Sequence, residues 1–387
     1  MTDRDPLSPT GRGGPPEPPP EATRPQRPRV DPWTIVLGIL GGVLLGTGVT
    51  LGVLGVTGVF TEPTTPTLPP LPDLTIPEPG PPPTFGEVVS AADVAGRVIP
   101  STVAVEVASL LGAGSGSGVV WTDNGDNGYI VTNHHVIAGA EEILVVFSDG
   151  ARYRAELVGS DPLTDIAVLK VDRPDLVPIA VGNSENLVVG EPAIAVGNPL
   201  GLEGGPTVSA GIISALDRAL AVSGGNVLYG LIQTDAPIAP GSSGGALVDA
   251  EGRLIGITTA IAVSNVGAEG VGFAVPVDLV VGVVDDLVET GEVRHALLGI
   301  QGDTVWATES EAEYPVGVGV LDLVQGSAYE TAGGQVNDVI VEFDGTPVRT
   351  IEELLARLRR HRAGDQVEVR ILRADREQTL TVTLGKR

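Results

Sequence analysis

The feature that most restricts the fold of this chain is a series of short Val- and Ile-rich runs between about residues 84 and 289. Gly, Asn and Asp separate the runs, so each is bounded by residues typical of turns. Many short strands joined by turns predict an all-β barrel or sandwich. Aromatic residues make up only 3% of the chain, so Val, Ile, Leu and Ala must fill the core. The predicted strands are 102–107, 118–121, 129–132, 143–147, 166–171, 193–196, 211–216, 254–259 and 272–276.

A second, smaller unit follows a predicted helix at residues 279–289 and extends from about residue 291 to residue 387. Within it, residues 351–362 have apolar side chains at helical spacing. Four other segments favour strands, and the mixture predicts a small α/β domain. These segments are 317–324, 339–343, 367–373 and 380–384.

The first 83 residues divide into three segments of different composition. Residues 1–31 are rich in Pro, Gly and Arg without apolar periodicity, which predicts a disordered tail. Residues 32–60 predict a single transmembrane helix, because the run 35–60 holds no charge and would span roughly 39 Å at about 1.5 Å per residue. Residues 61–83 are dominated by proline, which predicts a semi-rigid linker.

The arginines beside the apolar run predict its orientation. Arg24, Arg27 and Arg29 precede it, and Arg97 is the first basic residue after it. The positive-inside rule then places the tail in the cytoplasm and everything after residue 60 outside, anchored to the cell membrane by one pass. The alternative is a cleaved signal peptide, although the run is long for one and shows no obvious cleavage site.

Charge and composition exclude several classes of function. A formal net charge of −26 argues against nucleic acid as a partner, because such a surface repels phosphate. The absence of cysteine excludes disulfides, a thiol nucleophile and thiolate metal sites. Only four histidines are present, which argues against a zinc site. We therefore expect no metal and no cofactor. The histidines are His134, His135, His295 and His361.

The segment GSSGG at residues 241–245 is the strongest candidate for a catalytic turn. A serine nucleophile for acyl transfer needs a tight turn, and flanking glycines allow both the turn and close approach of a substrate. The backbone N–H groups of Gly241, Ser242 and Ser243 are the candidate donors to an oxyanion. In isolation, the same segment is also typical of an ordinary Gly/Ser turn.

Two further segments favour the catalytic interpretation. GYIVTNHHV at residues 128–136 is a predicted strand that ends in histidines, and DPLTDIAVLK at residues 161–170 is an aspartate-containing turn before a buried strand. A serine hydroxyl needs a base to take its proton, and that base needs a carboxylate to fix its tautomer. The order His, Asp, Ser within one predicted domain therefore indicates a serine hydrolase triad.

Taken together, these segments make the sequence resemble the HtrA (Deg) family of trypsin-like serine proteases. The resemblance extends from about residue 84 to the C-terminus. It implies a mainly β fold, with a chymotrypsin/trypsin-like double β-barrel protease domain at 84–290 and a small α/β PDZ domain at 291–387. The motifs are GSGSGV (114–119), GYIVTNHHV (128–136), DPLTDIAVLKV (161–171), GNPLG (197–201), QTDAPIAPGSSGGALV (233–248) and GFAVP (272–276).

The resemblance also assigns the base and the nucleophile. The family pattern T-N-x-H-V places the base at His135 and leaves His134 in the variable position. The pattern G-x-S-G-G places the nucleophile at Ser243, and Ser242 in the variable position is a rival serine.

The acidic member of the triad and the substrate preference follow in the same way. The resemblance places the carboxylate at Asp165, directly before the strand, with Asp161 as its rival. Small and aliphatic side chains near the expected primary pocket favour small or medium apolar residues at P1. They are Ile238, Ala260, Ile261 and Ala262.

The second domain resembles a PDZ domain, which binds an extended peptide at a sheet edge and holds its terminal carboxylate with backbone N–H groups. Arg294 and His295, just before the expected carboxylate loop, either add positive potential there or are solvated surface charges. That loop comprises Leu297, Leu298, Gly299 and Ile300.

The implied function is a membrane-anchored serine endopeptidase that cleaves unfolded or damaged extracytoplasmic proteins. Its PDZ domain would bind unfolded or C-terminally exposed polypeptides, and the resemblance also suggests a homotrimer. The alternative is a non-catalytic chaperone or PDZ adaptor, against which the filled triad positions argue.

Overall fold

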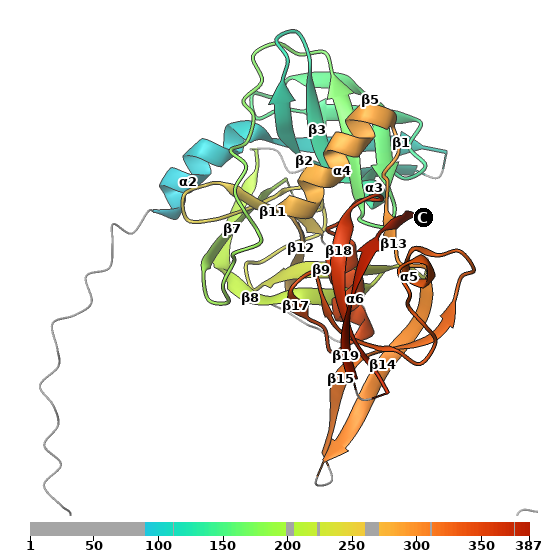
Figure 1. Cartoon of the computed structure of the whole chain (residues 1–387). Coiled ribbons are helices and arrows are strands. Elements are labelled where there is room, and N and C mark those ends of the chain that lie inside the picture. The colour runs from blue at the N-terminus through green and yellow to red at the C-terminus, as the bar shows by residue number, and fades with distance from the viewer. Residues whose placement is uncertain are drawn as a thin grey trace, which may run out of the picture. The chain divides into compact units, whose positions relative to one another are not determined.

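The computed structural model describes residues 90–110, 112–198, 205–222, 225–259, 271–309, 312–374 and 376–387 (Figure 1). These residues belong to one of two units of the chain, Thr84–Arg387. The predicted tail, transmembrane helix and linker lie outside the described residues. Among the residues that are described, no helix is long and apolar enough to cross a membrane.

The first six strands close into a barrel in the order β1-β2-β3-β6-β5-β4. Its interior is filled by fully buried aliphatic side chains such as Val105, Ile130, Val145 and Leu169. The predicted all-β unit is therefore a barrel, not a sandwich. Its strands are β1 (Thr102–Ser109), β2 (Gly112–Asp123), β3 (Gly128–Asn133), β4 (Glu142–Val146), β5 (Arg152–Asp161) and β6 (Ile166–Val171).

The next six strands close into a second barrel, in the order β10-β11-β12-β9-β8-β7. Every residue of β11 and β12 is buried, which explains why both segments lack polar–apolar alternation. The two barrels confirm the predicted trypsin-like double-barrel architecture. The strands are β7 (Pro192–Gly197), β8 (Thr207–Ala221), β9 (Val227–Thr234), β10 (Ala246–Val248), β11 (Leu254–Thr259) and β12 (Gly272–Pro276).

Short helices flank the barrels. Helix α2 (Ala91–Val98) begins at Ser90, whose hydroxyl accepts a hydrogen bond from the Ala92 N–H, and a 3-10 turn, η1 (Ile99–Ser101), follows it. Helix α3 (His134–Ile137) is a single turn after β3. Helix α4 (Val277–Thr290) buries Val280 and Val283 in a core shared with both barrels, and it ends at Gly291 in the left-handed conformation (φ 77°).

The C-terminal domain contains a sheet in the order β14-β15-β16-β18-β19, with Tyr329 and Phe343 fully buried in its core. Asn337 adopts φ 71°, so an asparagine supplies the left-handed turn before β16. The elements are β13 (Ala296–Leu297), β14 (Ile300–Glu309), β15 (Ala312–Leu323), α5 (Ala328–Thr331), β16 (Val339–Phe343), β17 (Thr346–Pro347), α6 (Ile351–Leu358), β18 (Gln366–Arg373), β19 (Arg376–Thr383) and β20 (Gly385–Lys386).

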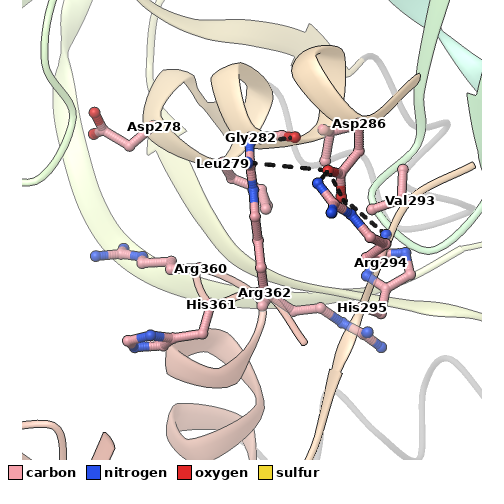
Figure 2. A pocket seen from close by; sticks show the side chains of 12 residues that line it. Asp278, Leu279, Gly282, Asp286, Val293, Arg294, His295, Arg360, His361 and Arg362 are labelled. Atoms are coloured by element: carbon pink, nitrogen blue, oxygen red, sulfur yellow. Dashed lines mark hydrogen bonds and ion pairs between the residues drawn. The ribbon is translucent and has the colours of Figure 1, made fainter. Parts of the chain in front are cut away.

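Charged groups connect α4 to the C-terminal domain around a small pocket with a volume of about 30 Å³ (Figure 2). Arg294 donates to Asp286 Oδ1 through Nε at 3.0 Å, and Arg362 donates to the carbonyl of Gly282 at 2.9 Å. Asp286 is only 1% exposed. Burial raises the pKa of this carboxyl, but the hydrogen bonds from Arg294 outweigh that effect and hold the pKa below its ordinary value.

Replacement of Asp286 by asparagine is expected to destabilise the fold at neutral pH. The substitution removes the charge that accepts the hydrogen bonds of Arg294. Because the Arg294 side chain is 41% exposed and also meets Glu289 at 3.4 Å, the loss should be roughly 1.5–3 kcal/mol. Because the folded-state pKa is depressed, the stabilisation is present above about pH 4 and is lost as the pH falls through the folded pKa. The difference between wild type and Asp286→Asn in denaturant unfolding should therefore shrink below about pH 4.

The matched control is Asp285→Asn, because Asp285 pairs with Arg362 at 3.3 Å but its side chain is 61% exposed. An exposed pair contributes about 0–1 kcal/mol, so this variant should unfold nearly like wild type. Equal losses in the two variants, or a loss in Asp286→Asn that does not change between pH 7 and pH 3, would refute the assignment.

Candidate active site

The structure brings His135 and Asp165 into direct contact where β3 and β6 run side by side. His135 lies in α3, directly after β3, and Asp165 directly precedes β6, which pairs with β3. The two side chains meet at 2.7 Å between Nδ1 and Oδ2, and the backbone N–H of His135 donates to Oδ1 at 3.0 Å. An ionised carboxylate can only accept, so Nδ1 carries the proton and Nε2 is left as the basic nitrogen.

Asp165 is held in an unusual backbone conformation, with φ at 60°. Its carbonyl accepts the N–H of His134 at 3.0 Å and the Nδ2–H of Asn133 at 2.9 Å. Left-handed backbone is rare for residues other than glycine and is often found at functional sites. These two bonds hold the turn that aims the carboxylate at His135.

Besides His135, a further residue contacts this carboxylate, and it lies in no recognisable sequence motif. Thr259, the last residue of β11, donates from Oγ1 to Asp165 Oδ2 at 3.1 Å, and it is 1% exposed. Because β11 belongs to the second barrel, the hydroxyl joins the two barrels at the carboxylate. Only the position of Thr259 at the end of a buried strand could have indicated this role.

The rival aspartate lies in a different environment. Asp161 Oδ1 meets His295 Nε2 at 2.9 Å, and Oδ2 accepts the hydroxyl of Thr164 at 2.6 Å. Burial raises the pKa of Asp161, but the hydrogen bonds from His295 and Thr164 outweigh it, so the pKa lies below its ordinary value. Asp161 therefore contacts His295 and Thr164, whereas Asp165 contacts His135, so the geometry favours Asp165.

The variable histidine also has a partner of its own. His134 Nδ1 lies 3.0 Å from the hydroxyl of Ser160. It therefore contacts the end of β5, whereas its neighbour His135 contacts the carboxylate that precedes β6.

Ser243 lies in the turn between β9 and β10 and is 5% exposed. Its carbonyl accepts the N–H of Ser117 from β2 at 2.7 Å. A Cβ added to Gly116 would lie 2.6 Å from Val136 Cγ1 and 3.2 Å from the Ser243 carbonyl oxygen. The segment that carries His135 and the turn that carries Ser243 therefore both approach Gly116 of β2.

Gly244 is the position in this turn where glycine is required most clearly. Its φ is 86°, and a Cβ there would lie 2.1 Å from the Ser117 carbonyl oxygen and 2.4 Å from Thr132 Oγ1. The turn thus packs its backbone directly on the first barrel, which no larger residue allows.

The expected set of oxyanion donors needs one correction. The N–H of Ser242 donates to the carbonyl of Ala239 at 2.9 Å, so the turn itself uses this group. Gly241, with φ 92°, and Ser243 supply the remaining two N–H groups of the predicted set. In the described residues, no cluster of three or more His, Asp or Glu is placed to bind a metal ion.

Comparisons with known proteins agree with this geometry. A model of the trypsin-like peptidase domain matches residues 116–257, and a model of the PDZ domain matches residues 293–384. A solved structure described as HtrA-type protease AlgW with tripeptide is 36% identical with a TM-score of 0.63, and the match covers 77% of this chain and 97% of that one. The chain belongs to the HtrA family.

Curated relatives of this HtrA chain come from distant organisms. Protease Do-like 1 of Arabidopsis thaliana chloroplasts is 41% identical over 287 residues, which covers 70% of this chain and 63% of that protein. The periplasmic pH-dependent serine endoprotease DegQ of Escherichia coli is 40% identical over 277 residues, with 70% and 59% covered. The HtrA chain thus spans about three-fifths of the length of these two relatives.

The primary pocket of this HtrA chain is described in part. A Cβ added to Gly272 would lie 2.6 Å from Ile238 Cδ1, so an isoleucine side chain presses against the backbone of β12. Residues 260–262, which were also expected here, lie outside the described residues. The preference for small or medium apolar P1 residues stays a prediction.

The predicted carboxylate loop precedes β14, which is an edge strand of the sheet. The carbonyls of Leu298 and Gly299 accept the N–H groups of Tyr329 and Val324, at 3.0 and 2.9 Å. In a trans peptide, C=O and N–H point in opposite directions, so the N–H groups of Gly299 and Ile300 are directed away from these partners. Leu297 is 37% exposed beside them.

The expected contribution of Arg294 and His295 to this loop is wrong. Arg294 is bound to the buried carboxylate of Asp286, and His295 is bound to Asp161. Each basic group therefore faces a counter-charge on the protease domain and does not stand free beside the loop.

Proposed function

We propose that this chain is a serine endopeptidase whose catalytic triad is His135, Asp165 and Ser243. The observation that supports this most directly is the 2.7 Å contact between His135 Nδ1 and Asp165 Oδ2, next to the glycine-flanked turn of Ser243. Such a pair fixes the tautomer that a histidine needs to act as a general base.

In the first half of the reaction, Ser243 Oγ attacks the carbonyl carbon of the scissile peptide, and His135 Nε2 takes the hydroxyl proton. The resulting imidazolium is stabilised by Asp165, whose carboxylate is oriented by Thr259. The negative oxygen of the tetrahedral intermediate accepts the N–H groups of Gly241 and Ser243. Collapse breaks the C–N bond, and His135 returns the proton to the leaving amine.

In the second half, water replaces the amine. His135 takes a proton from the water, the hydroxide adds to the acyl group on Ser243, and the same two N–H groups hold the second oxyanion. Collapse releases the new carboxyl terminus, and the proton returns to Ser243 Oγ. No metal or cofactor takes part in any step.

The test is cleavage of casein by the purified chain, with and without a serine-directed phosphonate. We expect the phosphonate to abolish cleavage and mass spectrometry to locate one adduct on Ser243. No cleavage by a folded wild-type protein, or cleavage that survives complete labelling, would favour the chaperone or adaptor alternative.

We further propose that its substrates are unfolded or damaged polypeptides with small or medium apolar P1 residues. The AlgW structures that resemble this chain are described as containing a tripeptide or a decapeptide. In this chain, β14 is an edge strand, and its Thr304 Oγ1 accepts the N–H of Ile351 from helix α6 at 3.1 Å. An extended peptide added to β14 would place its C-terminus at the Gly299 loop.

Capping the C-terminus of a bound peptide is expected to weaken binding at least about tenfold. Charge-assisted hydrogen bonds contribute roughly 1.5–3 kcal/mol each, and an amide removes the charge that the loop N–H groups hold. Calorimetry on the Ser243→Ala protein would compare free and amidated forms of one peptide with an apolar last residue. Acetylation of its N-terminus is the control and should change nothing, whereas equal affinity for the amide would refute C-terminal recognition.

We propose that residues 32–60 anchor the protease in the cell membrane with its catalytic domains outside, as the uncharged run and the arginine asymmetry suggest. Protease added to intact spheroplasts should digest the region after residue 60 and leave residues 1–31 protected. Recovery of only a soluble, N-terminally trimmed form would favour a signal peptide. The homotrimer stays a prediction, which can be tested by measuring the molar mass of the protein in solution by light scattering.

A further inference from the structure

The direction of a backbone N–H that donates to an oxyanion depends on the carbonyl at the other side of the same peptide unit. The carbonyl of one residue and the N–H of the next belong to the same rigid unit and point in opposite directions. The donor N–H of Ser243 therefore shares a plane with the carbonyl of Ser242, and whatever holds that carbonyl aims the N–H.

The group that holds it is the hydroxyl of Thr258 on β11. Thr258 Oγ1 donates to the Ser242 carbonyl at 2.6 Å, and the side chain is buried, since the residue is 1% exposed. The backbone of Thr258 is itself fixed on the turn, because its N–H donates to the Gly245 carbonyl at 2.9 Å and its carbonyl accepts the Gly244 N–H at 2.8 Å.

Ser117 on β2 holds the carbonyls on either side of that plane. Its hydroxyl donates to the Gly241 carbonyl at 2.8 Å, and its N–H donates to the Ser243 carbonyl at 2.7 Å. The hydroxyl also accepts the N–H of Asn198 at 2.8 Å, so both of its functions are used, and the residue is fully buried. Ser117 belongs to the GSGSGV motif, which contributes no residue to the proposed triad.

Such anchors matter here because glycines flank the catalytic turn. Gly241 and Gly244 have φ of 92° and 86°, and glycine places few steric limits on the rotation of neighbouring peptide planes. With Thr258 and Ser117 in place, three successive carbonyls of the turn, at residues 241, 242 and 243, are fixed from the two barrels.

We propose that Thr258 and Ser117 are positioning residues of the oxyanion hole: Thr258 aims the N–H of Ser243, and Ser117 fixes the neighbouring planes. Neither residue touches the substrate; both act through the backbone of the turn. This inference rests on the proposed endopeptidase function and deepens it.

The decisive comparison is Thr258→Val, which removes the hydroxyl and keeps the branched shape. Donors must be aligned with the transition state to be effective, so kcat should fall about tenfold or more while KM changes little. The affinity for a peptide boronate, whose tetrahedral adduct occupies the same hole, should fall by a similar factor. Thr258→Ser should restore most of kcat, and Ser117→Ala should show the same loss in kcat and boronate affinity.

The matched control is Thr102→Val. Thr102 is also fully buried, and its hydroxyl donates to the Val98 carbonyl at 3.1 Å, away from the turn, so this variant should keep wild-type kcat. A wild-type kcat in Thr258→Val would overturn the inference alone, whereas an inactive wild-type protein would overturn the proposed function as well. If Thr258→Val does not fold, the test is carried out on Ser117→Ala and Thr258→Ser. A boronate affinity of Ser117→Ala equal to that of wild type would then refute the proposal.

Discussion

Replacement of Ser243 by alanine is expected to abolish peptide-bond hydrolysis while the protein stays folded. Loss of the nucleophile in a serine protease lowers kcat by about 10⁶, because no other group can form the acyl intermediate. Only an Oγ atom is removed from a residue whose carbonyl accepts the N–H of Ser117. Casein cleavage and thermal unfolding, measured on the same preparation, would test both expectations.

Ser242→Ala is the matched control, since it removes the neighbouring hydroxyl from the same turn. Ser242 holds the turn through its backbone: its N–H donates to the carbonyl of Ala239, and its carbonyl accepts the hydroxyl of Thr258. This variant should therefore retain most of the activity. An inactive Ser242→Ala beside an active Ser243→Ala would show that the rival serine is the nucleophile.

Asp165→Asn is expected to lower kcat by about 10⁴, the loss typical of a trypsin-like triad whose carboxylate becomes an amide. An amide NH₂ facing His135 would favour the tautomer with its proton on Nε2, and this tautomer cannot accept the proton of Ser243. The N–H of His135 would still find the amide oxygen, and the Thr259 hydroxyl can turn to accept a hydrogen bond from the amide NH₂, so the fold should persist. Steady-state kinetics should show the loss in kcat.

Asp161→Asn makes the same chemical change four residues earlier in the chain. Asp161 contacts His295 and Thr164 instead of His135, so this variant should keep most of its catalytic rate. A loss as large as that of Asp165→Asn would mean that the buried carboxylate next to the PDZ domain takes part in the chemistry.

Many of the predicted strands are continuous apolar runs, although the predicted strands 367–373 and 380–384 alternate. The strands that were missed have different physical reasons. In β5, Tyr153 and Ala155 face the core, while Arg152 and Arg154 face solvent and pair with glutamates of β1 and β4. Its period-two pattern would have identified it. Strand β14 lies at a sheet edge and so needs no continuous apolar run, and Gly230, with φ 73°, interrupts β9.

The candidate site could be predicted as far as local motifs define it. His135, Asp165 and Ser243 each stand in a recognisable segment, whereas the hydroxyls that orient them do not. Thr259 lies 94 residues from its partner Asp165, and Ser117 lies 124 residues from Gly241. Contacts of this kind depend on how two barrels close against each other, which no local pattern records. Arg294 is a different case: its partner Asp286 lies only eight residues earlier, but on helix α4, and no sequence motif pairs the two.

The division of the catalytic groups between two separately closed barrels has a consequence for how this protein would fail under stress. His135 and Asp165 stand on one barrel, whereas Ser243 and Thr259 stand on the other. A slippage of about 1 Å between the barrels would misalign the reacting atoms, although every strand would keep its own hydrogen bonds. Enzymatic activity is thus more sensitive to the relative position of the two barrels than circular dichroism, which reports secondary-structure content. Mild heat or low denaturant concentrations should therefore abolish activity while the β-sheet signal in circular dichroism is unchanged.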